Sequence, residues 1–470
     1  MKATTRQLGL VMATTLVVGN MIGSGVFLLP ATLAPFGAFS LVGWVVSAVG
    51  ALLVAGVFYR LTRRMPLASG PYAYTREAFG DCVGFLVAWM YWVGVVIGNA
   101  AIAVAFAGYF LAMIPGIGTQ PLVSALVALA AIWSLTAVNL GGIRSAAAVQ
   151  VVTTVLKVAP LLVLAIFGLA HFDPQLLVAG SQTGTPLHAI NVSVAATLFA
   201  FLGVECATIP AGHVRDPART IPRATLLGTV IAAVLYIACT AAVMGVVPAA
   251  QLATSQAPFA LAGTLLWGSW TGWLIAGAAT ISCFGALNGW ILIVGQFPQA
   301  VARDGLLPGV FARESGRGAP VATLLIAGVV DSVLVLANYS HGLVAMFTFL
   351  LLLTALSGVF AYLFSALAEI VLAQRNGQRM RWRNLGLALA AFAFTMWATL
   401  GAGQEIVYWT FALMLIGLPL YVWQVYKAQQ VSTLGSEVAS SKIRAARERV
   451  LDPLHGSRRA ASSTTVESTP

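Results

Sequence analysis

Long apolar runs constrain the fold of this chain more than any other feature. Each is about 20 residues or longer, enough to cross the hydrocarbon core of a bilayer as an α-helix. Only 8% of the 470 residues are charged. We therefore predict an all-α polytopic membrane protein with twelve transmembrane helices, at residues 8–33, 38–62, 82–113, 122–141, 146–170, 188–212, 222–246, 268–300, 319–337, 343–371, 384–402 and 404–426.

Among the loops between these runs, positive charge occurs in every second one. The intervening loops contain no lysine or arginine. Cytoplasmic loops carry an excess of these residues, so both termini are predicted to be cytoplasmic. The alternation also supports the count of twelve, because one missed span would scramble it. The net charge of +11 thus reflects membrane topology and does not indicate a nucleic-acid partner. Typical members of these loops are Arg63, Arg144, Arg215, Arg303 and Arg381.

The first apolar run contains a poor helix former, the segment from Gly19 to Phe27. It holds three glycines, and each costs about 1 kcal/mol relative to alanine within a helix. Irregular backbone at membrane depth persists only where it is buried in protein or lines a cavity. We therefore expect the first helix to be discontinuous here and to form part of a binding site near the bilayer midplane.

A matching segment, Phe199 to Cys206, interrupts the sixth run. The stretches Gly19 to Pro30 and Phe199 to Pro210 have the same length, a glycine at the same offset and a closing proline. Runs 1 and 6 correspond if runs 1–5 and 6–10 are two repeats, and because five is odd, the second repeat must be inverted. Glycines that only serve helix packing explain either segment alone equally well, but not both together.

Two broken helices side by side suit an α-amino acid. The N-terminus of a half-helix presents unpaired N–H groups and partial positive charge, which favour a carboxylate. Unwound carbonyl groups favour a cation. An amino acid carries both groups on adjacent atoms, so the two breaks predict a site for its backbone. Specificity for the side chain must come from other residues.

The stretch Gly19 to Pro30 resembles the first span of the amino acid–polyamine–organocation superfamily. Loop motifs at Pro66 to Gly80 and Val214 to Ala224 resemble that superfamily too. The resemblance reaches Tyr426 and is strongest to the basic amino acid/polyamine antiporters, especially those that exchange arginine for agmatine. It implies a LeuT-like 5+5 inverted repeat with helices 1 and 6 discontinuous, two extra helices, and a homodimeric assembly. The corresponding boundaries are 1–431 for the transporter domain, with repeats at 8–170 and 188–371 and the extra helices at 384–426.

The resemblance also implies how the substrate's backbone would be held. The carboxylate would meet N–H groups at the start of the second half of span 1. The amine would meet unwound carbonyl groups of spans 1 and 6. The residues concerned are Ser24 and Gly25 for the carboxylate, Met21, Phe199 and Leu202 for the amine, and Asn20 in the same substrate-binding set.

Three residues are implied as contacts to the substrate's side chain. Trp290 would stack on it, which for a cation adds a cation–π contact of about 1–2 kcal/mol, although ordinary packing is the alternative role. Asn99 and Thr354 would contact its far end. For Asn99, a hydrogen bond between helices is an equally good interpretation.

The inner gate is implied at Tyr91, Glu205 and Tyr362. An acidic side chain within the membrane is costly unless it is paired or hydrated, so Glu205 is a functional candidate by default. It lies inside the break of span 6, where water and substrate can reach it. We expect it to act as a proton or substrate switch.

Two residues depart from the arginine/agmatine antiporters that this chain resembles. Phe199 replaces a tryptophan at the outer gate. Lys157 lies inside span 5, where those antiporters have a small apolar residue. Other members of the superfamily have a lysine there, thought to replace a structural sodium ion. Lys157 could therefore hold span 1 as a fixed cation, or carry protons.

Other chemistries find little support in the sequence. The four cysteines lie in or near spans and form no disulfide framework, and the histidines show no metal-ligand spacing. No phosphate-binding loop indicates ATP-driven transport, and no nucleophile–base pair indicates an enzyme. We expect no cofactor and no metal site. Asp331 in span 9 is a deeply placed acid to which the sequence assigns no role.

The sequence predicts a secondary amino acid transporter of the bacterial inner membrane that works by alternating access. Exchange of a cationic amino acid for its amine, as in arginine/agmatine antiport, is the preferred form. The alternative is a proton-coupled or facilitative carrier of neutral amino acids that uses Lys157. A third reading, a transporter-like sensor, would signal through residues 432–470, a predicted cytoplasmic and largely disordered tail.

Overall fold

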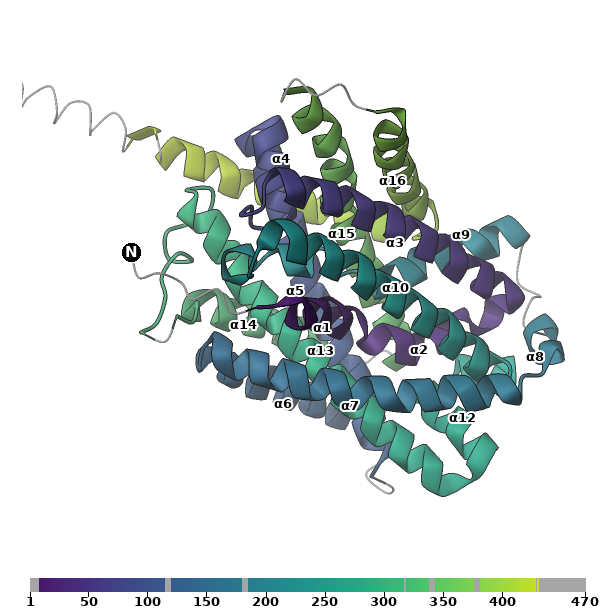
Figure 1. Ribbon diagram of the computed structural model, residues 1–470. Coiled ribbons are helices and arrows are strands. Elements are labelled where there is room, and N and C mark those ends of the chain that lie inside the picture. Colours follow the sequence, from purple (N-terminus) through teal and green to yellow (C-terminus); the bar gives the residue numbers. More distant parts are fainter. Residues whose placement is uncertain are drawn as a thin grey trace, which may run out of the picture. The chain divides into compact units, whose positions relative to one another are not determined.

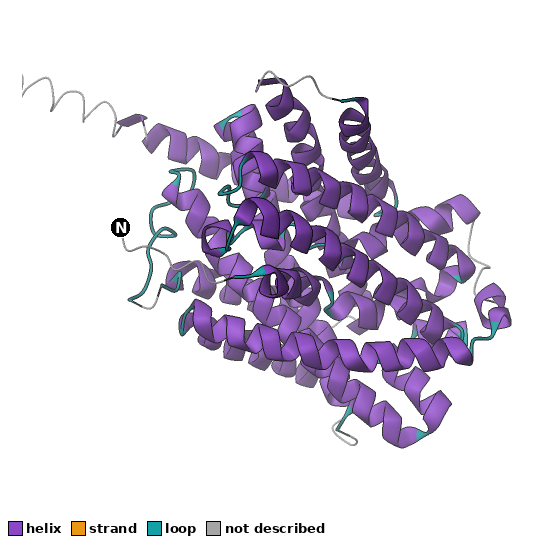
Figure 2. Cartoon of the chain, in the orientation of Figure 1, coloured by secondary structure: helices purple, strands orange, loops and turns teal. Residues whose placement is uncertain are grey.

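The computed structural model describes residues 8–114, 120–179, 185–316, 318–337, 343–375, 381–427 and 429–430. These residues are nearly all helical, and none of them forms a β-strand (Figure 2). Contacts group the chain into two compact units, Met1–Leu418 and Pro419–Pro470. All structure discussed below belongs to the first unit unless stated otherwise. The predicted all-α class is confirmed.

Every apolar run predicted from the sequence contains a helix. Nine helical segments of the described chain are long and apolar enough to cross a membrane, and α9, α14 and α16 occupy the other three runs. The helices are α1 Leu10–Met21, α2 Ser24–Leu33, α3 Ala38–Arg64, α5 Asp81–Ala112, α6 Pro121–Leu140, α7 Ile143–Ala170, α9 Pro186–Ala200, α10 Pro217–Met244, α13 Ser269–Arg303, α14 Val321–Ala337, α15 Leu343–Arg375, α16 Trp382–Leu400 and a last segment, Gln404–Lys427.

Short helices occupy the loops. They are η1 Ala34–Phe36, α4 Pro71–Phe79, α8 Pro174–Ala179, η2 Cys206–Thr208, η3 Ala211–His213, α11 Ala249–Ala253 and α12 Pro258–Trp267. The predicted boundary between transporter domain and tail stays a prediction, because residues 431–470 lie outside the described part of the chain.

The helix packing repeats when each span is exchanged for the one five positions later. In the first pair of contacts, α1 packs on α10 as α9 packs on α3. In the second, α5 packs on α15 as α13 packs on α7. Two further contacts, of α5 with α13 and of α6 with α14, each join a span to its own counterpart five positions later, so the exchange leaves them unchanged. This exchange is the pattern expected of two intertwined five-helix repeats. It places α1 and α2 in the middle of the unit, between α10 and α7 (Figure 1).

A glycine lies at each of the two crossings that bring the broken helices into the core. Gly43 of α3 lies against Ser193 of α9, and Gly228 of α10 lies against Val17 of α1. A Cβ atom at either glycine would collide with the facing side chain. Small residues let helices in membranes approach closely, and here they do so at both crossings.

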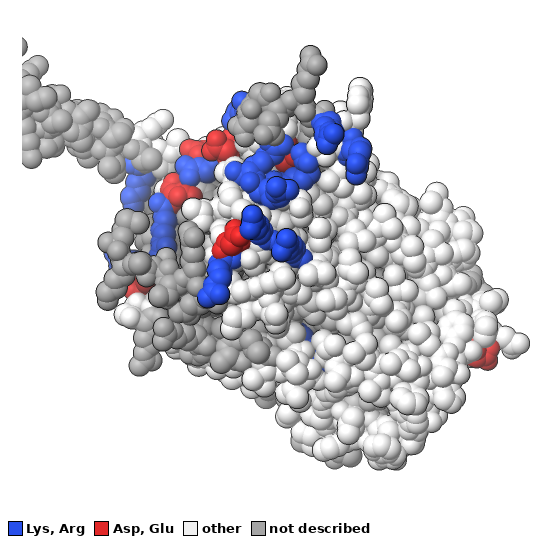
Figure 3. Space-filling view, viewed as in Figure 1, with Lys and Arg blue, Asp and Glu red and all other residues white. Residues whose placement is uncertain are grey.

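Charged side chains gather at one end of this unit. On the face seen in Figure 3, they cluster where α3 ends and α10 begins, and most of the remaining face is uncharged. Large apolar side chains are exposed along the helices, such as Val49 of α3, Ile166 of α7 and Val234 of α10. Such exposure suits contact with lipid hydrocarbon and makes this an integral membrane protein.

Helix α4 joins the start of α5 to the end of α13 at this charged end. The Tyr72 hydroxyl donates to Oδ2 of Asp304 over 2.8 Å, and Arg76 pairs with Asp81 over 2.7 Å. Burial and the Asp304 carboxylate raise the pKa of Tyr72 well above its ordinary value. Tyr72 therefore stays a neutral hydrogen-bond donor across the physiological pH range.

A buried ion cluster joins α3 to α15. Glu369, which is fully buried, accepts from Arg60 Nε over 2.6 Å and from Arg64 Nε over 3.1 Å. Two cations around one buried carboxylate form a network in which each charge depends on the others. Removing the acid would leave two partly buried guanidinium groups without their counter-charge.

Replacing Glu369 by alanine should therefore destabilise the fold by about 3–5 kcal/mol, as expected when one partner of a buried pair is removed. Thermal unfolding of the purified protein in detergent measures this. The control is Glu314→Ala, because Glu314 pairs with Arg303 at the surface and is 38% exposed; its loss should cost no more than about 1 kcal/mol. Equal losses in the two variants would contradict the argument.

Candidate functional site

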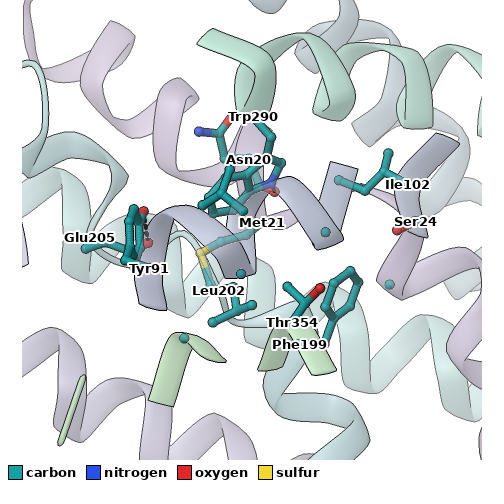
Figure 4. Close-up of a pocket in the computed structure, with 16 residues that line it drawn as sticks. Asn20, Met21, Ser24, Tyr91, Ile102, Phe199, Leu202, Glu205, Trp290 and Thr354 are labelled. Carbon is teal, nitrogen blue, oxygen red and sulfur yellow. Dashed lines mark hydrogen bonds between the residues drawn. The ribbon is translucent and has the colours of Figure 1, made fainter. Parts of the chain in front are cut away.

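A pocket lies between the two broken helices, and its walls come from α5, α13 and α15. Its empty space is about 490 Å³, including open solvent. Figure 4 shows Glu205 and Tyr91 at one end, with Thr354 and Phe199 away from them. The lining residues are Asn20, Met21, Gly23, Ser24, Gly25, Tyr91, Gly94, Val95, Gly98, Ile102, Phe199, Leu202, Glu205, Trp290, Thr354 and Gly358.

The first break separates α1 from α2. Helix α1 ends at Met21 and α2 begins at Ser24. The N-cap residue of α2 is Gly23, which has no side chain to accept from the first N–H groups of the helix. The first N–H groups of α2 have no partner within their own helix, and Ser24 Oγ is buried without a partner among the described residues. These groups face the pocket, where they can donate to a carboxylate.

The second break follows α9, which ends at Ala200. The backbone turns through Gly203, whose φ of +110° favours glycine. A Cβ atom there would also lie 3.3 Å from Met21 Cγ and 3.4 Å from Trp290 Cζ2. Glycine therefore serves both the turn and the close approach of the two breaks, as the shared glycine offset in the sequence indicated.

Glu205 stands in this second break and is held from three sides. Its Oε1 accepts from the Tyr91 hydroxyl over 2.6 Å, and its Oε2 from the Tyr362 hydroxyl over 2.6 Å. The Gly203 N–H donates to Oε2 over 3.3 Å. The carboxyl group, fully buried, thus joins α5, the second break and α15. These are the three residues predicted for the inner gate.

Trp290 fixes the backbone at the first break. Its indole N–H donates to the carbonyl oxygen of Asn20 over 3.0 Å, while the ring lines the pocket. Gln150 of α7 donates to Asn20 Oδ1 over 3.2 Å. Asn20 is therefore held by both α13 and α7. Gln150 was not among the predicted residues, and a lone glutamine in an apolar run gave the only signal for it.

The ammonium group of Lys157, on α7, binds the C-terminal end of α1. Its fully buried ammonium group donates to the carbonyl oxygens of Gly19 and Ile22, both over 2.6 Å. These are carbonyl groups that the break releases from the helix. The predicted alternative of a fixed cation that holds span 1 matches this geometry.

Phe199 lines the pocket and packs against a neighbouring aromatic ring. The Phe199 ring lies edge-on to Phe347 of α15, with centroids 6.1 Å apart. Phe27 of α2 packs edge-on against Phe259 of α12 at 5.0 Å. Phe199 is 8% exposed and lines the pocket; its role as the lid of the outer gate stays a prediction.

Most of the residues predicted for substrate binding line this pocket. Asn99 does not: it is fully buried, and neither polar atom of its amide has a hydrogen-bond partner among the described residues. Its contact with the far end of the substrate, which the resemblance implied, stays a prediction. The predicted residues on the pocket wall are Asn20, Met21, Ser24, Gly25, Tyr91, Phe199, Leu202, Glu205, Trp290 and Thr354.

Several lining residues were missed from the sequence. Gly94 and Gly98 of α5 face Ser357 and Thr354 of α15, so close that a Cβ atom at Gly98 would lie 3.0 Å from Thr354 Cγ2. The spacing of these glycines, four residues apart, is a packing signal in membrane helices. This spacing predicts that α5 packs closely against another helix. It does not predict that the same glycines leave room for a ligand.

Tyr362→Phe should loosen the closure around Glu205. A hydrogen bond to a carboxylate contributes about 1.5–3 kcal/mol, so the opened population should rise about 10- to 100-fold. Cys206, adjacent to Glu205 and fully buried, reports the opening through its rate of reaction with N-ethylmaleimide. The experiment uses a Cys82→Ser background, because Cys82 is exposed.

Tyr236→Phe is the matched control. Its hydroxyl donates to the Ala200 carbonyl over 3.0 Å and does not contact Glu205. This variant should leave the labelling rate of Cys206 unchanged. An equal rise in both variants would show general loosening of the helices and would refute a gate at Glu205.

The chain is similar over almost its whole length to known transporters. The amino acid permease family matches residues 8–427. A cadaverine/lysine antiporter of Escherichia coli (strain K12) is 32% identical over 441 residues, which cover 92% of this chain and 98% of the relative. A putrescine transporter of Haemophilus influenzae is 32% identical over 431 residues, covering 91% and 99%. Another, of Escherichia coli (strain K12), is 31% identical over 428 residues, covering 89% and 96%. With the discontinuous helices and the pocket between them, these matches show that the chain is a transporter and belongs to the amino acid permease family of the amino acid–polyamine–organocation superfamily.

Proposed function

We propose that this permease exchanges a cationic amino acid for the diamine formed from it by decarboxylation. The charge of the pocket carries this proposal. Of the residues that line it, Glu205 is the one charged residue, and none is lysine, arginine or histidine. A pocket with one acid and an aromatic face at Trp290 favours a substrate with a positive side chain.

The similar proteins refine the substrate. The relatives above are named for cadaverine and lysine, or for putrescine. They support antiport of cationic amines and give no particular support to arginine and agmatine, the pair expected from the sequence. We therefore place lysine with cadaverine first and a putrescine exchange second. Arginine with agmatine remains a pair to be tested.

The two breaks would divide the work of binding between them. A substrate carboxylate fits the free N–H groups near Ser24 and Gly25, and an amine fits carbonyl groups near Met21 and Leu202. A diamine has no carboxylate, so it would leave the N–H groups of α2 to water. Closure at Phe199 on one side and at Glu205 on the other would alternate. We further propose cytoplasmic termini, from the loop charges, and a homodimer, from the resemblance.

Exchange should be visible in proteoliposomes. Vesicles loaded with cadaverine or putrescine should take up labelled lysine or ornithine about tenfold faster than empty vesicles, because loaded carriers reorient with substrate in both directions. Arginine with agmatine is assayed in parallel. Norleucine, which matches lysine but lacks the ε-amine, is the control and should neither enter nor stimulate. Absence of stimulation by every one of these amines would refute exchange.

Lys157 supports a second candidate, proton-coupled uptake of neutral amino acids. An ammonium group that holds two carbonyls at the first break could couple a proton to the movement of α1. In this case, uptake would need a pH gradient and no internal substrate. The bonds of Lys157 to Gly19 and Ile22 are compatible with both candidates, because a fixed cation at this place would stabilise the break during exchange as well.

Lys157→Ala separates the two candidates. Loss of two charge-assisted hydrogen bonds, each contributing about 1.5–3 kcal/mol, should slow exchange at least about tenfold. If pH-driven uptake of neutral amino acids into empty vesicles occurs and disappears in this variant, the second candidate is favoured. Lys427→Ala, at an exposed position in the second unit, is the control. Unchanged transport in Lys157→Ala would count against the lysine in both mechanisms.

A further inference from the structure

Helix α4 belongs to the loop motif at Pro66 to Gly80, to which the proposed function gives no role. Its two tyrosines, Tyr72 and Tyr74, are fully buried, although the helix lies at the charged end of the unit. Large aromatic side chains bury much apolar surface. These two therefore tie α4 to the helices around it, and the rings that they contact lead toward the pocket.

Tyr72 is connected to Glu205 through a single phenylalanine. The Phe297 ring of α13 contacts Tyr72 edge-on, with centroids 6.4 Å apart, and contacts Tyr91 of α5 with centroids 4.7 Å apart. Phe297 is 1% exposed. Tyr91 in turn donates to Glu205 (Figure 4). An unbroken series of side chains thus runs from α4 to the gate predicted at Glu205.

A second series reaches the other tyrosine of that gate. Phe58 of α3 contacts Tyr74 with centroids 6.4 Å apart, and contacts Tyr362 with centroids 5.9 Å apart. Aromatic pairs stabilise each other at separations of about 4.5–7 Å. Tyr362 also donates to Glu205. Each tyrosine that donates to Glu205 therefore contacts a phenylalanine that contacts a tyrosine of α4.

Polar, partly exposed contacts fasten α4 to the end of α13. The Tyr72 hydroxyl donates to Asp304 over 2.8 Å. Arg76 pairs with the same carboxylate over 3.3 Å and with Asp81 of α5 over 2.7 Å. Asp304 is 48% exposed, so water can replace these partners at little cost. This joint can open while the helices on either side of it stay folded.

The contacts follow one another from the pocket to the charged end. On α13, Trp290 lines the pocket, Phe297 lies two turns further on, and Asp304 directly follows the helix. Seven residues of α-helix rise about 10 Å. The ring of Phe297 and its contact with α4 therefore lie beyond the pocket wall, between Glu205 and the solvent at the charged end.

We propose that α4 is a second gate between the pocket and the charged end, and that Phe297 and Phe58 couple it to the gate at Glu205. Tyr72 and Tyr74 are positioning residues here: while they hold the two phenylalanines, the gate tyrosines stay on Glu205. Release of α4 from the end of α13 frees Phe297 and lets the gate open toward the charged end. This inference rests on the proposed alternation of closure and deepens it, because it names what controls one of the two sides.

Sided labelling of Cys206 in the full-length protein, reconstituted in vesicles, tests the proposal. Cys206 neighbours Glu205 and is fully buried, and Cys82→Ser removes the exposed cysteine. A charged methanethiosulfonate reagent that cannot cross the membrane is added to one side at a time. Tyr72→Phe keeps the ring and loses the bond to Asp304, so labelling should rise about tenfold from the side of the charged end. From the other side it should change by less than about twofold.

Two matched variants and an internal reference accompany this measurement. Asp304→Asn alters a partly exposed side chain and leaves the buried rings intact, so it should act in the same direction as Tyr72→Phe. Glu314→Gln is the control, because Glu314 is 38% exposed and pairs with Arg303 of α13 instead of a residue of α4; it should leave the rate unchanged. Cys239, fully buried on α10, should keep its labelling rate in every sample.

Phe297→Leu tests the coupling itself. Leucine is too short to contact both Tyr72 and Tyr91. In this background, adding Tyr72→Phe should change the labelling of Cys206 by less than about twofold, because residues that act in series are not additive. A full tenfold effect of Tyr72→Phe in the absence of the Phe297 ring would refute the coupling.

The outcomes separate this inference from the gate on which it rests. If Tyr362→Phe exposes Cys206 but Tyr72→Phe and Asp304→Asn do not, the gate at Glu205 stands and the role of α4 is overturned. If Tyr362→Phe has no effect either, both are overturned. A rise from both sides of the membrane, or a parallel rise at Cys239, indicates general loosening of the helices and also overturns the role of α4.

Discussion

Unpaired backbone groups at membrane depth are the constraint on which this structure depends. Each free N–H or C=O in apolar surroundings costs several kcal/mol, and the two breaks release a set of them. Side chains from other helices satisfy the carbonyl groups: Lys157 binds Gly19 and Ile22, Trp290 binds Asn20, and Tyr236 binds Ala200. The N–H groups at the start of α2 receive no such partner from within their own helix, and they face the pocket. The partition of satisfied and free groups thus defines the site.

The repeat brings these groups together. One break would line a groove between helices, but two related breaks in the centre enclose a pocket. Their approach depends on small residues at equivalent crossings, Gly43 with α9 and Gly228 with α1, and on Gly203 between Met21 and Trp290. The same close contact leaves room for a ligand where the wall of α5 consists of Gly94 and Gly98. Glycine therefore serves two purposes: at the helix crossings it permits close packing, and on the wall of α5 it leaves space for a ligand.

The two buried acids near the pocket stand in different electrostatic situations. Glu205 is surrounded by hydroxyl and N–H donors that stabilise its position and close one end. Asp331 makes no ion pair in the described part of the chain, and its Oδ1 has no hydrogen-bond partner there. The hydrogen bonds of Glu205 let it act as a latch between helices, whereas Asp331 is buried outside the pocket lining.

The sequence by itself determined the fold class, the alternation of loops and the two broken helices, because hydropathy and glycine content act locally along the chain. It also marked Glu205 and Lys157, since charge is rare inside apolar runs, whereas Trp290 was marked mostly by the family resemblance. Some contacts were beyond it: Gln150, which donates to Asn20, lies in a span far from it in the chain. Asn99 shows the limit as well, because its residue type suited the pocket and only the tertiary structure decided that it does not line it. Local chemistry fixes what each helix can offer, and tertiary contact decides which groups remain free to bind.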